Sequence, residues 1–590
     1  MSRTVRIAFP PLVVAIVGLV VIFAVGERPS QQTVAAMLVS MIFAIGWNII
    51  GGYAGQASFG QAAYFGLGAY TMTLLTGVGV PPLVGMWGGV IVAAVAALLI
   101  GLITFRLTGI YFALSTVVFP IILMTLAIYF DVQEVSFPYK PNQGILYFAP
   151  DVPEVLSLIA LCATVAAVAI SSLIENSKTG LYLHALRSDQ GAAEASGVDT
   201  MAQKLLALVV SAALSAVAGA LYCPAVLVLT PDGVFGLLRS VEPVIFTVFG
   251  GIGTLWGPLI GAGILHPLTY YLDTTLGGSL PGASGLLYGI ALLIVILVFP
   301  QGLFWGIRSA FRRHFAAKGV SMSSARAVAH AEAFSAPSGT TTSAVGPPVL
   351  QIENVQKSFG GLHVLSQVTF EARKGEILGV IGPNGAGKTT LFNLINGFMP
   401  IDGGRIIVNG TDVAGLKPHQ VFAHGIGRTF QMVRDFKRLT VVDNVMIPAL
   451  TRGRGRRKAL EIAEEALVEV GLAERAGVMV DELSTGELRR MELARAMCGD
   501  SSVFLLDEFL GGLGGQDATA ILDVIRRVRA RGVTIVAIEH TMHAMTSLVD
   551  RFVVLNFGRI IATGTAREVA ENPEVVEAYL GKRWAARAGH

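Results

Sequence analysis

Two stretches far apart in the chain carry residue types that suit phosphate chemistry. The first, GPNGAGKT, fits the pattern G-x-x-x-x-G-K-[ST] between a strand-like EILGVI and a helix-like TTLFNLING. Glycines in such a loop let backbone N–H groups point at phosphates, while Lys388 reaches the β and γ oxygens and the Thr389 hydroxyl binds Mg²⁺. A chance glycine turn is the alternative, but the flanking strand and helix disfavour it. We therefore expect nucleotide contacts from Gly382, Pro383, Asn384, Gly385, Ala386, Gly387, Lys388, Thr389 and Thr390.

The second stretch, SVFLLDE, places Asp507 and Glu508 at the end of an apolar strand. Carboxylates are rare at buried positions unless they serve a metal or a reaction, and this pair follows the phosphate loop in the order that phosphate-cleaving enzymes use. We expect Asp507 to hold Mg²⁺ and Glu508 to polarise the water that attacks the phosphate. A plain strand end with two solvated acids is the alternative.

The elements around both stretches predict an α/β domain. From Val349 onward, short apolar runs such as VTIVAIEH and RFVVLNFGRII alternate with amphipathic stretches, as in a sheet flanked by helices. The preceding part differs, since the first 300 residues hold only 21 of the 83 charged side chains. We predict a multi-domain chain with an α-helical membrane domain at 1–306, a flexible cytoplasmic linker at 307–348 and the α/β domain at 349–590.

About ten apolar spans are predicted in the membrane part, since about 20 helical residues cross a bilayer. Arg3, Lys178 and Arg308 flank spans, and basic residues stay on the cytoplasmic side. We therefore expect contact with lipid, and both termini and the α/β domain in the cytoplasm. The spans lie near 9–26, 33–53, 60–77, 83–104, 108–129, 153–174, 204–228, 255–272 and 284–300, with a half-length one near 243–253.

Composition narrows the partners and the site chemistry. The net charge of +3 is too small and too dispersed to indicate a nucleic-acid partner. Three cysteines without metal-type spacing suggest neither a disulfide framework nor a zinc site. The phosphate loop and the paired carboxylates therefore remain the main chemical features, with a nucleotide and Mg²⁺ as the expected ligands.

The α/β domain resembles the ABC transporter ATPases over Leu350–Gly581. ELSTGELRRMELARAM looks like the signature of that family, RTFQ supplies its Q-loop glutamine, and EH after VTIVAI supplies its switch histidine. The resemblance implies that the signature contacts the ATP of a partner subunit, that the glutamine coordinates Mg²⁺, and that the histidine contacts the γ-phosphate. KSFGG carries an aromatic similar to the one that stacks on adenine, with a core phenylalanine as an equal alternative. The residues implied are Ser484, Gly486, Glu487, Gln431, His540 and Phe359.

Four positions depart from the usual ABC pattern. Thr485 and Glu487 stand where glycine and glutamine are usual, Phe509 stands where proline normally follows the catalytic glutamate, and Gly514 stands where aspartate or asparagine is usual. The departures leave open a weakened hydrolysis at one of two paired sites. Every charged group that faces the nucleotide in the family is present.

The membrane part resembles the permease subunit of the branched-chain, or hydrophobic, amino acid importers. Five segments carry the likeness in order, among them WNIIGGYAGQASFGQAAYFGLGAYT and VFGGIGTLWGPLIGAGIL, and RTFQMVRDFKRLTVVDNV resembles their ATPase subunits. The resemblance implies a fusion of the second permease type with the ATPase, ATP-driven import across a bacterial cytoplasmic membrane, and a periplasmic solute-binding protein. It also implies a second permease and a second ATPase, as a homodimer or a hetero-assembly.

The resemblance leaves the solute and some roles open. Branched-chain amino acids, urea, short amides and aromatic acids all suit the family, while an exporter half or a non-transporting ATP-gated protein are alternatives from other classes. The segment SKTGLYLHALRSDQGAAEASGVDTMAQK resembles the coupling helix of the family, with an ordinary cytoplasmic loop as the alternative. Its docking residues beside Gln431 would be Arg187, Asp189 and Glu194.

The glycine-interrupted stretch Gly51–Thr71 is the predicted solute pathway. Breaks in a membrane helix are tolerated where they line a cavity or pack on protein. Close helix packing through small residues explains the glycines equally well. The polar groups of this stretch and its approach are Asn48, Gln56, Ser58 and Gln61.

Overall fold

The computed structural model describes residues 3–24, 28–138, 145–148, 153–276, 302–306, 346–539 and 545–580, with a few isolated positions between 286 and 298. The chain forms two compact units. The first comprises residues 1–187 and 201–322, and the second comprises residues 188–200 and 323–590. His540, nearly all of the linker at 307–348 and most of the span near 284–300 lie outside the described residues.

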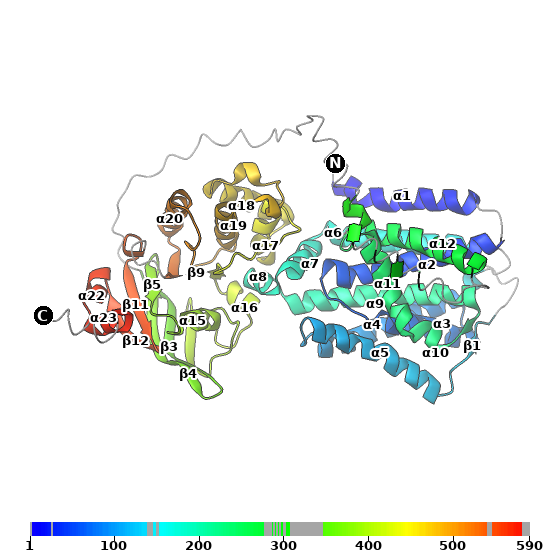
Figure 1. The fold of residues 1–590 in the computed structure, drawn as a ribbon, viewed down its shortest axis with the longest axis horizontal. Coiled ribbons are helices and arrows are strands. Elements are labelled where there is room, and N and C mark those ends of the chain that lie inside the picture. The colour runs from blue at the N-terminus through cyan, green and yellow to red at the C-terminus, as the bar shows by residue number, and fades with distance from the viewer. Residues whose placement is uncertain are drawn as a thin grey trace. The chain divides into compact units, whose positions relative to one another are not determined.

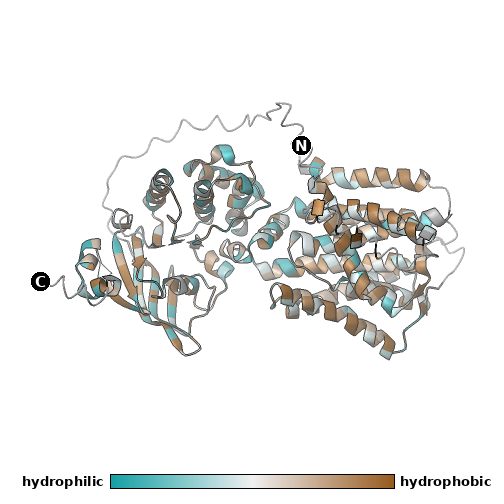
Figure 2. Ribbon diagram, in the orientation of Figure 1, coloured by the Kyte–Doolittle hydropathy of each residue, from teal (hydrophilic) through white to brown (hydrophobic). Residues whose placement is uncertain are grey.

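Long helices make up the first unit (Figure 1), and most of them are apolar (Figure 2). Among the described residues, seven helices are long and apolar enough to cross a membrane. The half-length span predicted near 243–253 begins earlier, at Leu237. The helices are α1 (Arg3–Ala24), α2 (Arg28–Trp47), α3 (Gln61–Gly77), α4 (Pro82–Thr104), α5 (Ile110–Tyr129), α6 (Pro153–Glu175), α7 (Lys178–Ser188), α9 (Thr200–Val226), α10 (Pro231–Phe235), α11 (Leu237–Gly250) and α12 (Gly257–Leu276).

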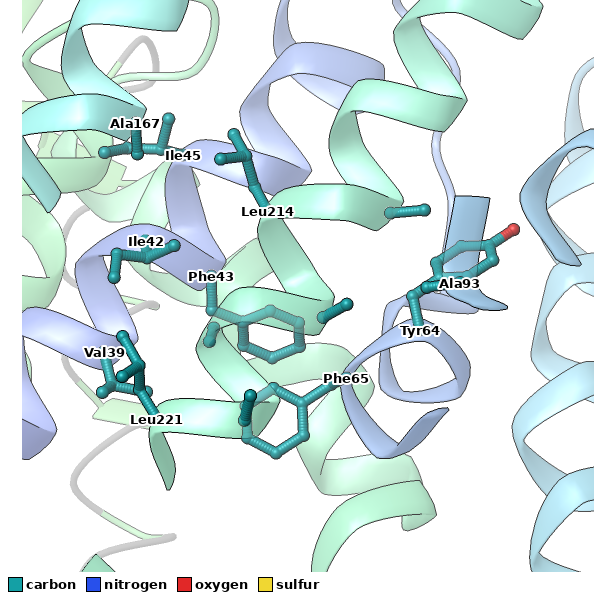
Figure 3. Close-up of a cluster of buried hydrophobic side chains, with 14 of the residues drawn as sticks. Val39, Ile42, Phe43, Ile45, Tyr64, Phe65, Ala93, Ala167, Leu214 and Leu221 are labelled. Carbon is teal, nitrogen blue, oxygen red and sulfur yellow. The ribbon is translucent and has the colours of Figure 1, made fainter. Parts of the chain in front are cut away.

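The core of the first unit forms around α2. In the span Gln31–Tyr53, which contains most of α2, 83% of the most apolar 18-residue stretch is buried, whereas the corresponding share is 11% in α1 and 17% in α5. Figure 3 shows Phe43 of α2 beside Phe65 of α3, with Leu214 and Leu221 of α9 in the same cluster; the two phenylalanine rings have centroids 4.9 Å apart. Helices α1 and α5 instead expose apolar side chains, which suits contact with lipid.

A six-residue π-helix (Asn48–Tyr53) continues α2, and all of its residues are buried. The Asn48 side chain accepts a bond from the Gly253 N–H at 2.8 Å and donates one to the Thr254 carbonyl at 3.0 Å. This asparagine therefore ties the end of α2 to the turn between α11 and α12. Its amide is used in these structural bonds.

The glycines that follow are sites of close helix packing. A Cβ atom at Gly68 would lie 2.2 Å from the Ala216 carbonyl oxygen of α9, and a Cβ atom at Gly219 would lie 1.9 Å from the Phe65 carbonyl oxygen. Side chains larger than hydrogen would force α3 and α9 apart. Packing thus accounts for Gly68 and Gly219, and the role of the stretch Gly51–Thr71 in a solute pathway stays a prediction.

Two sheets organise the second unit. The larger has the order β12-β11-β5-β10-β9-β8, with β12 antiparallel at its edge and the other pairs parallel, and the smaller has the order β4-β3-β6-β7. Strands β5, β9 and β10 are buried along their full lengths. The strands are β3 (Pro348–Phe359), β4 (Leu362–Arg373), β5 (Ile377–Ile381), β6 (Gly403–Val408), β7 (Thr411–Asp412), β8 (Ile426–Arg428), β9 (Val503–Asp507), β10 (Thr534–Ile538), β11 (Arg551–Asn556) and β12 (Arg559–Gly564).

Helices connect and flank these strands (Figure 1). The order of strands and helices confirms the predicted α/β class. The principal helices are α15 (Lys388–Ile395), α16 (Pro418–Ala423), α17 (Val441–Thr451), α18 (Arg456–Glu469), α19 (Thr485–Met497), α20 (Gly515–Ala530), α22 (Ala566–Ala570) and α23 (Pro573–Leu580).

Residues 188–200 pack within the second unit and contain α8 (Gln190–Ala195). Asp189 caps this helix by accepting a bond from the Ala192 N–H at 2.7 Å, and its carboxylate lies 3.3 Å from Arg434 Nη1. Arg434 is three residues beyond Gln431, so the contact of Asp189 agrees with the predicted docking. Glu194 instead accepts a bond from Thr200 within its own segment, at 2.5 Å.

Candidate functional site

The carboxyl edge of the larger sheet gathers the predicted chemistry. Ile538 at the end of β10 pairs with Val380 of β5 on one side and with Asp507 of β9 on the other. The phosphate loop follows β5 and the two carboxylates follow β9, so both meet at one edge. Ligands of open parallel sheets bind outside this edge.

The phosphate loop has the backbone shape that its glycines allow. Gly385 and Gly387 have φ values of +81° and +102°, in the left-handed region that residues with a side chain rarely adopt. Gly387 leads directly into α15, which starts at Lys388. The N–H groups of such a helix start suit an anion.

Lys388 lies folded over its own loop. Its Nζ donates to the carbonyl oxygens of Gly382 at 2.7 Å and Pro383 at 3.0 Å. Burial lowers the pKa of the ammonium group, and the neighbouring carboxylates of Glu508 and Asp507 oppose this shift. The charge is thus held at the loop, where phosphate oxygens would compete with the two carbonyls.

A cavity of about 480 Å³ lies over this loop. Its wall includes Asn384 through Thr390 together with Gln431 and Glu508. The Gln431 Nε2 atom donates to Glu508 Oε2 at 2.7 Å, although 77 residues separate the two in sequence. Glu508 has a φ value of +46°, an uncommon conformation for a residue with a side chain. The structure therefore brings three predicted groups to one cavity.

Asp507 lies behind the cavity and is 2% exposed. Burial raises the pKa of its carboxyl group, while the Arg428 guanidinium, 3.3 Å away, opposes that shift. Arg428 also donates to Asn393 Oδ1 at 2.8 Å. Sequence reasoning missed Arg428, although a charged residue within the buried strand β8 is a signal that it has a partner.

The residues fit a nucleotide phosphate with a divalent cation. The loop offers backbone donors and one ammonium group, and Thr389 adds a hydroxyl at the cavity wall. Among the described residues, no group of three or more histidine, cysteine, aspartate or glutamate side chains forms a metal site. A cation here would use phosphate oxygens besides the predicted protein contacts Thr389, Gln431 and Asp507, as Mg²⁺ commonly does.

The signature residues begin α19. Ser484 accepts a bond from the Glu487 N–H at 3.3 Å, and Glu487 accepts one from the Ser484 N–H at 2.9 Å. This reciprocal pair is a capping box, so the unusual glutamate stabilises the helix start. Gly486 packs closely on Asp517: a Cβ atom at Gly486 would lie 2.5 Å from the Asp517 carboxylate. Ser484, Gly486 and Glu487 are not among the residues that line the cavity over the loop.

The other two departures have different consequences. Phe509 is 2% exposed and packs as a core residue. Gly514 caps α20 with an extended backbone and no side-chain bond, whereas aspartate or asparagine would supply one. The predicted weakening of hydrolysis is not tested by these contacts.

Phe359 is 46% exposed, so it is not a core phenylalanine. The Lys357 ammonium group lies 5.5 Å from its ring centroid. Its stacking on adenine stays a prediction. A further cavity of about 550 Å³ lies beside Pro383 through Ala386 and is also lined by Phe557 and by Glu574 of α23, which sequence reasoning did not single out.

Comparisons with known proteins assign each half of the chain. A family model described as "Branched-chain amino acid transport system / permease component" matches residues 31–297. Two others match the second half, "ABC transporter" at residues 365–511 and "Branched-chain amino acid ATP-binding cassette transporter" at residues 559–585. The first match lies in the first unit and the other two lie in the second.

Individual relatives match the second half. A high-affinity branched-chain amino acid transport ATP-binding protein of Pseudomonas aeruginosa is 36% identical over 253 residues, which are 40% of this chain and 98% of that protein. The Escherichia coli protein of the same description is 35% identical over 251 residues, with the same shares. A lipopolysaccharide export system ATP-binding protein of Haemophilus influenzae is 33% identical over 237 residues, again 40% and 98%.

A solved structure is similar to the same half. It is a nucleotide-free ATP-binding cassette from an ABC transporter, 30% identical, with a TM-score of 0.37, covering 40% of this chain and 100% of that chain.

Proposed function

The chain belongs to the branched-chain amino acid ABC transporters, with permease and ATP-binding cassette in one polypeptide, and we propose that it imports a branched-chain amino acid with energy from ATP hydrolysis. The observation that carries the proposal is the cavity where the phosphate loop, Gln431 and Glu508 meet. The apolar helices of the first unit make the chain a membrane protein.

Each residue of the cavity has a role in the proposed reaction. Lys388 would exchange its two carbonyl partners for β- and γ-phosphate oxygens, which are stronger acceptors because they are charged. Glu508 would polarise the attacking water, and its bond from Gln431 fixes where that carboxylate stands. A bound Mg²⁺ would neutralise charge on the phosphates, with Thr389, Gln431 and Asp507 as its proposed protein contacts. His540 would contact the γ-phosphate.

A second cassette would complete the site. Ser484, Gly486 and Glu487 do not line the cavity of their own chain, which supports their proposed action on the ATP of a partner subunit. Two permeases and two ATPases would therefore assemble, as a homodimer or with related subunits. We further propose a periplasmic solute-binding protein as donor of the solute, and a bacterial cytoplasmic membrane with the cassette and both termini inside.

Motion would pass through residues 188–200. Asp189 of this segment contacts Arg434, which follows Gln431 by three residues. Closure of two cassettes on ATP would move the loop and the segment together, and the attached helices α7 and α9 would follow.

An exporter half is the second candidate, since a cassette relative belongs to a lipopolysaccharide export system. The permease match at residues 31–297 favours import instead. The test is ATP-driven accumulation of labelled leucine, urea and benzoate in vesicles, with the cognate binding protein supplied on the outside. Leucine accumulation is expected; movement of solute only outward, or ATP turnover with no solute movement, would contradict the proposal.

A further inference from the structure

Two opposite charges lie together in an otherwise apolar part of the first unit. Arg239 and Glu242 occupy neighbouring turns of α11, and Arg239 Nη1 lies 2.7 Å from Glu242 Oε2. Ionisable groups within membrane spans are rare because lipid does not solvate them, and they commonly mark a functional site. The pair therefore needs an explanation other than helix formation.

Aromatic side chains surround the guanidinium group. Its central carbon lies 4.6 Å from the ring centroid of Tyr222 in α9 and 5.1 Å from that of Phe65 in α3. The Arg239 Nε atom also donates to the Gly233 carbonyl at 3.2 Å. Three segments outside α11 thus hold the arginine in one position. The result is a fixed cation beside an apolar, aromatic wall.

The pair lies near the middle of the candidate membrane span Pro231–Gly250. Glu242 precedes the end of α11 at Gly250 by eight residues, which at 1.5 Å each is about 12 Å. Half the hydrocarbon thickness is about 15 Å. Solute sites of transporters lie at this depth.

The charged groups can be reached from the surface of the unit. The side chain of Arg239 is 20% exposed and that of Glu242 is 17% exposed. A charged pair exposed at this depth is unfavourable against lipid, but it is favourable against a water-filled pathway or a neighbouring subunit. Because Arg239 and Glu242 both lie on α11, the bond between them does not connect α11 to another helix and does not by itself stabilise the fold.

We propose that Arg239 and Glu242 bind the charged end of an α-amino acid on its way through the membrane, with Arg239 taking the carboxylate and Glu242 the ammonium group. Arginine has five N–H donors, so its bonds to Gly233 and Glu242 leave donors for a second carboxylate. Tyr222, which is only partly buried, offers apolar surface for the side chain of the solute, while Phe65 is 1% exposed and supports the arginine from within the core. This inference rests on the proposed import of an amino acid and narrows its solute class.

The two charges discriminate between the solutes that the family accepts. A zwitterion can satisfy both Arg239 and Glu242 at once. Urea and amides carry no charge, and an aromatic acid carries only the negative one, so each would leave a desolvated charge without a new partner. Sites with unpaired polar groups reject such analogues strongly.

The test is binding of labelled leucine to the full-length protein in nanodiscs, with three unlabelled competitors. These are leucine, 4-methylpentanoate, which lacks the ammonium group, and leucinamide, which lacks the carboxylate. For the wild type we expect each analogue to need a concentration roughly tenfold higher than leucine, or more, to displace the labelled leucine, because each analogue loses a charged hydrogen bond. Equal competition by all three would overturn the proposal without any variant.

Two single variants then assign the roles. Glu242→Gln should raise the competition by 4-methylpentanoate relative to leucine, and Arg239→Gln should raise that of leucinamide. Stronger competition by one analogue requires a folded protein. If the pair had only a structural role, its loss would weaken binding of leucine and of both analogues alike. Unchanged rankings in both variants would overturn the assignment.

A matched control comes from the cassette. Arg526 and Asp523 form an exposed pair with the same three-residue spacing, 2.9 Å apart, and Arg526→Gln/Asp523→Asn should leave leucine binding unchanged. If the wild type binds no leucine, the proposed solute is wrong. If it binds leucine while the variants keep its ranking of analogues, only the present inference is wrong.

Discussion

Replacing Arg428 by methionine should destabilise the second unit strongly. Arg428 and Asp507 are each 3% exposed at the side chain, so the substitution leaves a buried carboxylate without its cation. The guanidinium carbon also lies 5.2 Å from the ring centroid of Phe430, a contact that methionine replaces only in part. The lost charge should therefore dominate the effect.

The magnitude follows from the burial of both groups. Removing one partner of a buried ion pair costs about 3–5 kcal/mol, because the remaining charge stays desolvated. For a domain of this size, each kcal/mol shifts the melting temperature by about 2–4 °C. Arg428→Met should thus lower the melting temperature of the second unit by about 6–20 °C.

Differential scanning calorimetry of the full-length protein in detergent measures this shift. The matched double variant Arg428→Met/Asp507→Asn removes both charges, and it should recover most of the lost stability, since apolar or neutral replacements of a buried pair are often tolerated. It should still fail to hydrolyse ATP, because Asp507 is the proposed cation ligand. A double variant no more stable than Arg428→Met would refute the reasoning.

Two further substitutions test buried groups, one in the second unit and one in the first. Burial raises the pKa of Glu492 in α19 to about 6 from an ordinary 4.5, so its stabilising contribution is complete below about pH 4.5 and is lost as the pH rises through about 6. Between these pH values the free energy of unfolding of the wild type should fall by about 2 kcal/mol more than that of Glu492→Gln. Calorimetry in which both proteins show the same pH dependence would contradict this. Gly219→Ala should destabilise the first unit by about 1–3 kcal/mol, because its Cβ atom would meet the Phe65 carbonyl oxygen. The control Gly77→Ala should not destabilise it, because a Cβ atom at Gly77 has no other atom within 4 Å. Equal effects of the two substitutions on thermal unfolding would contradict the packing.

Local chemistry made the phosphate loop predictable. Gly382 to Thr389 are contiguous, and their glycines, lysine and hydroxyl define the site without knowledge of the rest of the fold. The strand before Asp507 was equally clear from its apolar run. In contrast, the contact of Gln431 with Glu508 joins residues 77 positions apart, so the residues alone did not place them together, and only the resemblance assigned Gln431 to the nucleotide site.

Other features depended on packing that the sequence does not display. The sequence left Phe359 open between stacking on adenine and a place in the core, and the structure shows it 46% exposed at the end of β3. Arg239 and Glu242 are visible in the sequence as opposite charges three residues apart in an apolar span, but the rings that surround Arg239 come from two other helices. The glycines of α3 suited either a pathway or close packing, and the short distance from Gly68 to Ala216 of α9 shows packing at that position.

The central claim is that nucleotide held by Lys388 drives solute through the helices of the same chain. The most direct measurement is ATP-dependent accumulation of leucine in vesicles, together with retention of Mg-ATP, for the wild type and Lys388→Ala. The variant should lose both retention and accumulation. Accumulation that continues unchanged in Lys388→Ala would contradict the account.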